Sequence, residues 1–112
     1  MNETCDLAQQ KCTPCQGGVP ALKGEAIKNM LRKLDGWEVV NQHHLRKEYH
    51  FPDFVTALAF VNRIGAVAEA EGHHPDLTLG WGKAGVEIFT HKVNGLTESD
   101  FILAAKIDAL PH

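Results

Sequence analysis

Apolar residues along this chain recur first with a helical period and then with the alternating period of a strand. A first helix is predicted by spacings of three and four among Ile27, Met30, Leu31 and Leu34. Gly36 stands where a C-terminal cap is expected. Residues 37–40 and 45–51 then alternate apolar and polar side chains on either side of the polar segment 41–44. This pattern predicts two strands joined as a hairpin, with one face buried.

The period changes again after Asp53, a residue suited to cap the N-terminus of a second helix. This helix is predicted to end at Gly72. Its apolar stripe consists of Phe54, Leu58, Val61, Gly65 and Ala68, widened by Phe60, Ile64 and Val67. Two further alternating segments, 77–81 and 86–91, flank a turn over 82–85 and predict a second hairpin.

A last helix is predicted to begin at Thr97 and to continue to the C-terminus. Thr97 is a good cap residue, and Asp100 occupies the position three residues later that completes a capping box. Leu96 and Phe101 are spaced to form the hydrophobic staple that often accompanies such a start.

The order helix, two strands, helix, two strands, helix predicts the α+β class. We expect two layers, a four-stranded antiparallel sheet with the helices on one face. Residues 1–22 show no sustained period and contain paired glycines, prolines and all three cysteines, so they are interpreted as an N-terminal arm. Residues 23–112 are expected to form the single domain.

Composition narrows the classes of function. A length of 112 residues fits one domain with a real core. The net charge of −3 gives no basic footprint for direct nucleic-acid binding. No apolar run approaches the roughly 20 residues of a membrane span. The first residues contain neither a basic leader nor an apolar stretch, which predicts a cytoplasmic protein.

Histidine is over-represented, with seven in the chain. Its ordinary pKa of about 6.5 suits it to acid–base chemistry or to metal binding. His73 and His74 follow the second helix, and Pro75 holds His74 in an extended conformation, so the two rings are expected to point in different directions. Glu69 lies one helical turn before His73 and is expected beside that ring.

His91 is predicted at the end of the fourth strand. If the third and fourth strands pair across their turn, this end lies opposite the start of the third strand, and His91 comes close to His73 and His74. Trp81 and Phe89 are expected to form an aromatic wall for a flat ligand. A three-histidine zinc site is an alternative, although the spacing does not match H-E-x-x-H. Ordinary surface or hydrogen-bonded histidines are the non-functional alternative.

The motif Glu69-x-x-x-His73-His74-Pro75, followed at fixed spacings by Trp81, His91 and Asp100, resembles the signature of the pterin-4a-carbinolamine dehydratases. The similarity extends over residues 20–110 and includes the segments Phe51-Pro52-Asp53-Phe54, Ala57-Leu58-Ala59-Phe60, Thr90-His91 and Gly95-Leu96-Thr97.

This resemblance implies a lyase that dehydrates 4a-hydroxytetrahydropterin to quinonoid dihydropterin and so recycles the cofactor of an aromatic amino acid hydroxylase. It implies no metal and no organic cofactor, and a homodimer or a dimer of dimers. The implied catalytic residues are His73, His91 and His74, supported by Glu69 and Asp100. The implied substrate-binding residues are His73, His74, Pro75, Trp81, Thr90, His91, Lys92 and Val93.

Two other functions belong to different classes. Animal members of the family also bind a homeodomain transcription factor, so a binding protein is one alternative, and a role in molybdopterin metabolism is another. Cys12 and Cys15 form a C-x-x-C pair, with Cys5 as a third thiol. They are interpreted as part of a reduced arm without a ligand, or as part of a zinc site shared across a dimer. His43 and His44 fall in the predicted first turn and are interpreted as solvent-exposed.

Overall fold

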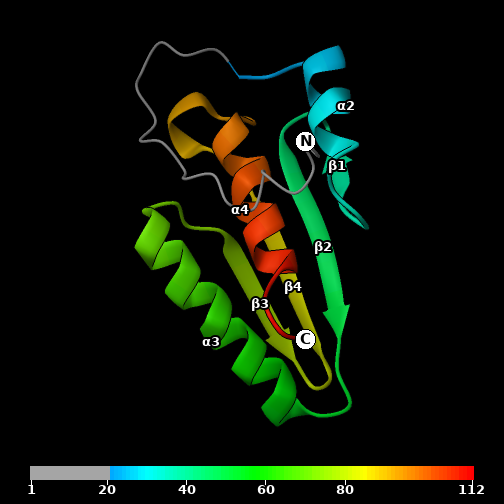
Figure 1. Cartoon of the computed structure of the whole chain (residues 1–112), viewed down its shortest axis with the longest axis vertical. Helices are drawn as coiled ribbons and strands as arrows, with labels where there is room; N and C mark the ends of the chain where they lie inside the picture. The colour runs from blue at the N-terminus through cyan, green and yellow to red at the C-terminus, as the bar shows by residue number, and fades with distance from the viewer. Residues whose placement is uncertain (1–20) are drawn as a thin grey trace, which may run out of the picture.

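A computed structural model describes residues 21–112 of the protein and confirms the predicted order of elements (Figure 1). The elements are α2 (Glu25–Leu31), β1 (Glu38–Val40), β2 (His44–His50), α3 (Phe54–Glu71), β3 (Asp76–Gly80), β4 (Lys83–Ile88), the short 3-10 helix η1 (His91–Val93) and α4 (Glu98–Asp108). The predicted arm over residues 1–22, with Cys5, Cys12 and Cys15, lies outside the described residues apart from its last two positions.

The four strands form one antiparallel sheet in the order β1-β2-β4-β3, which confirms the predicted fold class. Both predicted hairpins are present, and β4 lies between β2 and β3. Leu45 pairs with Ile88, and Asp76 pairs with Glu87. The start of β2, the end of β4 and the start of β3 therefore lie at the same end of the sheet.

Alternation along the strands separates a buried face from an open one. Leu45 and Tyr49 on β2 and Val86 and Ile88 on β4 are buried beneath the helices, while the residues between them are exposed or half-buried. α3 packs on β3 and β4, and α4 packs on β2 (Figure 1). The core contains Phe60 and Ile64 of α3 together with Phe101, Leu103 and Ile107 of α4.

Local signals in the sequence set both ends of α3. The Asp53 carboxylate accepts a hydrogen bond of 2.9 Å from the backbone N–H of Thr56, as predicted for a cap. This bond and a second one from the Thr56 hydroxyl lower the pKa of Asp53. At the other end Gly72 adopts a left-handed conformation with φ of 66°, which glycine tolerates without steric cost.

Three predicted boundaries are wrong. α2 ends at Leu31, because the next residues form turns that lead to Gly36. The turn between β3 and β4 consists of Trp81 and Gly82 alone, with Gly80 paired to Lys83, since the left-handed Gly82 allows a tight reversal. β4 ends at Ile88, and His91 therefore lies in η1 rather than in a strand.

Asp108 connects the end of α4 with the sheet. Its carboxylate accepts hydrogen bonds from the Trp37 indole at 2.9 Å, from the Lys47 ammonium at 2.8 Å and from the Tyr49 hydroxyl. The Lys47 Nζ also lies 4.8 Å from the centre of the Tyr49 ring. Burial and the neighbouring Asp108 carboxylate raise the pKa of Tyr49, so its hydroxyl remains a hydrogen-bond donor.

No helix within residues 21–112 is both long enough and apolar enough to cross a membrane.

We expect the free energy of unfolding to fall as the pH rises above about 10, the pKa of an unperturbed tyrosine. The reason is that the unfolded chain then releases the Tyr49 proton while the folded protein still holds it, because the pKa in the folded state is raised. Urea denaturation followed by tryptophan fluorescence on both sides of that pH measures the effect. Since Tyr49 is the only tyrosine, the ultraviolet absorbance of tyrosinate reports its ionisation directly.

Tyr49→Phe is the control, and its stability should fall less steeply over the same alkaline range. An identical slope in the two proteins would contradict the raised pKa of Tyr49.

Candidate active site

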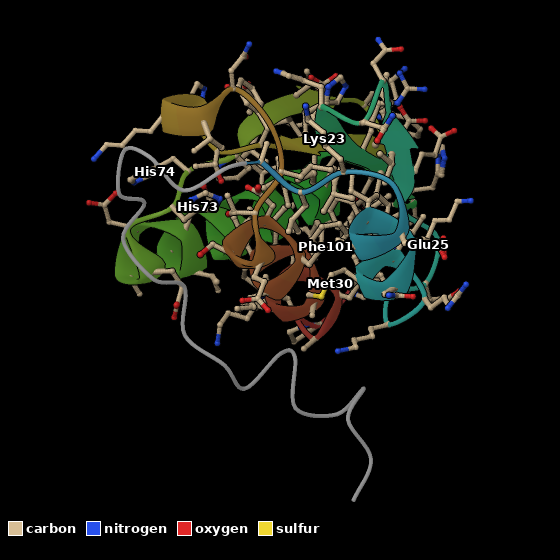
Figure 2. The ribbon with its side chains drawn as sticks, turned by 90° about the horizontal axis from the view of Figure 1, so that it is seen from above. Lys23, Glu25, Met30, His73, His74 and Phe101 are labelled. Carbon is tan, nitrogen blue, oxygen red and sulfur yellow. The ribbon has the colours of Figure 1, made fainter. Side chains whose placement is uncertain are left out.

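The candidate site begins where the chain leaves α3. After the left-handed Gly72, the backbone N–H of His73 donates to the carbonyl of Ala68 at 3.2 Å. The chain then runs through His74 and Pro75 into β3. Figure 2 shows His73 and His74 beside one another at this end of α3, with His73 nearer to α4.

A buried carboxylate holds His73 in place. Asp100, in the first turn of α4, is fully buried, and its Oδ1 lies 2.5 Å from Nε2 of His73. The other oxygen, Oδ2, accepts hydrogen bonds from the Thr90 hydroxyl at 2.9 Å and from the Thr97 backbone N–H at 2.8 Å. Because an ionised carboxylate only accepts, His73 carries a proton on Nε2, and its Nδ1 is the nitrogen left for other chemistry.

Asp100 therefore does more than the predicted capping box requires. The box itself is confirmed, since the Asp100 side chain accepts from the backbone of Thr97. The same carboxylate also joins the end of α3 to the segment that follows β4, through His73 and Thr90. The sequence predicted Asp100 as a supporting residue of the site. In the structure, the histidine that its carboxylate contacts is His73.

His91 lies next to this network along the chain. Thr90 is buried and pairs with Gly95, its N–H donating to the Gly95 carbonyl at 2.8 Å, so residues 91–94 form a closed turn. The His91 ring is exposed and packs on Phe89, with ring centres 4.2 Å apart. His73 and His91 are thus connected through Asp100 and Thr90, with a tilted aromatic pair, Phe89 and His91, on the His91 side.

The predicted partner of Glu69 is wrong. Its carboxylate lies 2.9 Å from Nε2 of His74 rather than beside His73. The physical reason is that α3 ends before His73, and the left-handed Gly72 turns that residue toward α4. The His74–Glu69 pair is largely exposed, with 61% and 81% of the two side chains accessible. The expectation that His73 and His74 point in different directions agrees with these separate partners.

Trp81 does not lie with the histidines of its own chain, so the predicted aromatic wall is wrong in this respect. It occupies the turn after β3, whereas His73 and His74 precede the same strand. At about 3.3 Å per residue, the five residues of β3 place the tryptophan about 17 Å away. Its side chain is 73% exposed. Phe89, the other predicted member of the wall, does contact His91.

The remaining predicted residues flank the site. Pro75 is half-buried between His74 and β3, and Lys92 and Val93 belong to η1 immediately after His91. Within residues 21–112, no three histidine, cysteine, aspartate or glutamate side chains converge as metal ligands would.

The interpretation of His43 and His44 as solvent-exposed turn residues is only partly right, because His43 lies in the turn but His44 is the first residue of β2. Both are half-buried, and the His43 ring packs on Phe89 with ring centres 4.4 Å apart. Its Nε2 lies 2.9 Å from Oδ1 of Asn94. The local sequence does not predict these contacts, because they depend on the pairing of β2 with β4.

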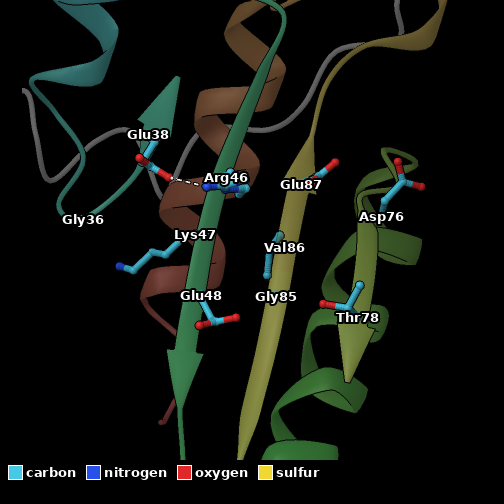
Figure 3. A pocket seen from close by; sticks show the side chains of 10 residues that line it. All are labelled: Gly36, Glu38, Arg46, Lys47, Glu48, Asp76, Thr78, Gly85, Val86 and Glu87. Carbon is cyan, nitrogen blue, oxygen red and sulfur yellow. Dashed lines mark hydrogen bonds and ion pairs between the residues drawn. The ribbon is translucent and has the colours of Figure 1, made fainter. Parts of the chain in front are cut away.

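A separate hollow of about 650 Å³ lies on the open face of the sheet (Figure 3). The ion pair between Arg46 and Glu38, at 3.1 Å, lies in it, and Glu48, Asp76 and Glu87 add further carboxylates. None of the ten residues that line it is a histidine or an aromatic residue. His73, His74 and His91 are therefore not among the residues that line this hollow.

Comparison with known proteins gives consistent matches over the described domain. The family described as pterin 4 alpha carbinolamine dehydratase matches residues 20–110. A Rubrobacter xylanophilus protein named as a pterin-4-alpha-carbinolamine dehydratase is 56% identical over 94% of this chain and 98% of its own length. A Rickettsia bellii protein with the same name is also 56% identical and aligns over the full length of both chains.

Solved structures share the fold. A Brucella melitensis protein described as a transcriptional coactivator/pterin dehydratase has a TM-score of 0.75 at 33% identity, over 80% of this chain and 96% of that one. A pterin dehydratase-like protein identified as a RuBisCO assembly factor in the alpha-carboxysome has a TM-score of 0.58 at 22% identity, over 67% of this chain and 88% of that one. At that identity the second likeness concerns the fold alone.

Two histidine–carboxylate pairs in different surroundings allow a matched comparison of stability. We expect Asp100→Ala to lower the free energy of unfolding by about 2–4 kcal/mol, because it leaves buried donors on His73, Thr90 and Thr97 without their acceptor. Glu69→Ala removes an exposed pair and should cost less than about 1 kcal/mol. Urea denaturation monitored by circular dichroism measures both, and equal losses would contradict the anchoring role of Asp100.

Proposed function

Because the chain belongs to the pterin 4 alpha carbinolamine dehydratase family, we propose that it removes water from 4a-hydroxytetrahydropterin to give quinonoid dihydropterin. The observation that carries this proposal is the connection of His73 to the His91 segment through the buried Asp100 carboxylate. That arrangement presents two imidazole rings at one end of the sheet. It suits a reaction in which one proton is added and another is removed.

The dehydration requires two proton transfers. The oxygen on C4a accepts a proton and leaves as water when its bond to C4a breaks. The lone pair of the adjacent ring nitrogen forms a double bond to C4a, and the proton on that nitrogen passes to a base. Atoms and charge balance without a redox partner. General acid–base catalysis of this kind typically contributes about 10²–10⁴-fold to the rate.

His73 is suited to one of these transfers by its hydrogen bond to Asp100. With a proton fixed on Nε2, the neutral ring offers a lone pair on Nδ1, and the carboxylate stabilises the cation that forms when Nδ1 takes a proton. In our proposal His91 carries the opposite transfer at the 4a-hydroxyl. In this proposal one ring acts as the base while the other acts as the acid, so loss of either ring removes one of the two proton transfers.

The neighbouring residues are proposed to bind the pterin. His74, oriented by Glu69, directs a ring nitrogen toward the substrate, and Pro75 restricts the backbone beside it. Thr90, Lys92 and Val93, which flank His91 in the chain, are proposed to contact the pterin as well. The Phe89 ring, inclined by 44° to the His91 ring, packs against it and supports it beside the proposed position of the pterin.

Burial favours catalysis over a purely binding role at this site. Asp100 is fully buried, while only 14% of the His73 side chain is exposed. Desolvating an ionisable pair in this way is expensive, and such pairs gather where acid–base chemistry is performed. A binding protein would gain little from aligning an almost enclosed histidine with a buried carboxylate.

The biological setting forms part of the same proposal. We propose that the protein recycles the pterin cofactor of an aromatic amino acid hydroxylase in the cytoplasm, with no metal and no organic cofactor of its own. We further propose that it works as a homodimer or a dimer of dimers. Large exposed apolar side chains support association, namely those of Phe54, Val55, Leu58 and Trp81.

Purified His73→Ala and His91→Ala proteins should each lose about 10²-fold or more in dehydratase rate, because each removes one of the two proton transfers. The assay follows chemically prepared 4a-hydroxytetrahydropterin, with the uncatalysed rate subtracted. Circular dichroism establishes that the variants are folded.

His50→Ala is the matched control, because His50 is an exposed histidine of β2 that pairs with Glu48. Its activity should equal that of the unmodified protein. Full activity in either His73→Ala or His91→Ala would remove that residue from the mechanism, and an inactive parent protein would refute the proposed activity.

The proposed association predicts a mass of at least twice 12.3 kDa in light scattering of the purified protein. Val55→Asp places a charge on an exposed apolar side chain and should shift the mass downward if α3 takes part. A parent protein that is monomeric at all concentrations would contradict the proposal.

A further inference from the structure

His43 contacts both ends of the segment that carries His91. On one side its ring packs on Phe89, with centres 4.4 Å apart and planes inclined by 40°. On the other side its Nε2 lies 2.9 Å from Oδ1 of Asn94. Phe89 and Asn94 precede and follow η1, although His43 is 46 and 51 positions away from them in the sequence. One side chain thus bridges the base of the turn that presents His91.

The Phe89 ring transmits this contact to His91. It packs against His43 on one side and against His91 at 4.2 Å on another, so three rings follow one another from the first hairpin to the candidate site. Within residues 21–112, the His91 ring has no hydrogen bond, and Phe89 is its one ring contact. The orientation of His91 therefore depends on the position of the Phe89 ring.

Hydrogen bonds fix the His43 ring in turn. The Asn94 Oδ1 is a carbonyl oxygen, so Nε2 of His43 donates to it, and Nδ1 is left as an acceptor. Nδ1 of His44 lies 3.1 Å away and supplies the matching donor. Asn94 is held by its own backbone, a left-handed residue with φ of 51° whose N–H donates to the His91 carbonyl at 3.2 Å. One partner of the His43 ring, Asn94, is thus held in the turn that ends η1, and the other, His44, is the first residue of β2.

The sheet register explains why the contact exists. Leu45 pairs with Ile88 in the antiparallel ladder between β2 and β4. The residues just before Leu45 therefore lie alongside those just after Ile88. The turn that holds His43 is itself a tight one, with Asn41 and Gln42 both at positive φ and the His43 N–H donating to the Val40 carbonyl at 2.9 Å.

We infer that His43 is a positioning residue for His91, acting through Phe89 and Asn94. It does not lie among the groups proposed to touch the pterin. The catalytic consequence rests on the proposed function, because His91 is a proton-transfer group only if the protein is a dehydratase. The structural consequence, a fixed orientation of the His91 ring, does not depend on activity.

His43→Ala tests the inference through two readouts. The first is the NMR signal of the His91 ring protons, assigned by comparison with His91→Gln. This signal should move toward the position of an imidazole with no aromatic neighbour as the Phe89 ring loses its support. The second is steady-state kinetics, where we expect kcat to fall about tenfold and KM to change by less than about twofold, because orientation rather than binding is lost.

His44→Ala is the matched control from the same histidine doublet. It removes the bond to Nδ1 of His43 but neither the Phe89 contact nor the Asn94 bond. Its His91 signals and its kcat should stay close to those of the parent. If His44→Ala and His43→Ala changed both readouts equally, the effect would come from the turn as a whole and the inference would be overturned.

Two further variants separate the two contacts. His43→Phe keeps a ring against Phe89 and should restore most of the His91 signal and rate. Asn94→Gly removes the acceptor while allowing the left-handed backbone, and should shift the His91 signals in the same direction as His43→Ala. Unchanged His91 signals in a folded, active His43→Ala would overturn the inference and leave the proposed function intact. A parent protein without dehydratase activity would remove the proposed function, while the NMR comparison would still decide the inference.

Discussion

The buried carboxylate of Asp100 is the interaction on which the candidate site depends. It accepts hydrogen bonds from His73, Thr90 and Thr97, and so joins the end of α3, the segment after β4 and the start of α4. Its place in the first turn of α4 favours a negative charge, because the free backbone N–H groups there give the N-terminal end of the helix a partial positive charge. A helix cap and the orientation of a candidate catalytic ring are therefore properties of one side chain, and selection for one cannot be separated from the other.

α4 is fixed to the rest of the domain by carboxylates at both ends. At its C-terminal end, Asp108 faces the unfavourable pole of the helix dipole, and the Lys47 ammonium at 2.8 Å offsets that cost. This second network connects α4 to the middle of β2 and leaves the site untouched. Asp108 therefore contributes only to packing α4 on the sheet, whereas Asp100 contributes both to the fold and to the orientation of His73 in the candidate site.

The sheet decides which distant segments meet. Because β4 pairs with both β2 and β3, the start of β2, the start of β3 and the end of β4 converge at one end. His43 and His91 come together through the first pairing, and His73 arrives from α3 beside the second. The same geometry sends Trp81 to the opposite end of β3, which is why its sequence spacing to the histidines did not translate into proximity.

The sequence by itself determined the class and order of the elements, because alternation, helical stripes and the caps at Asp53, Gly72 and Thr97 act over a few residues. It also identified His73, His74, His91 and Asp100 as candidates by motif. Which carboxylate serves which histidine was decided only by tertiary structure: a local rule paired Glu69 with His73, whereas the left-handed Gly72 turned that ring to Asp100, twenty-seven positions away. The contacts of His43 could not be predicted from the sequence either. Strand register and the burial of polar atoms depend on the whole fold and not on spacing along the chain.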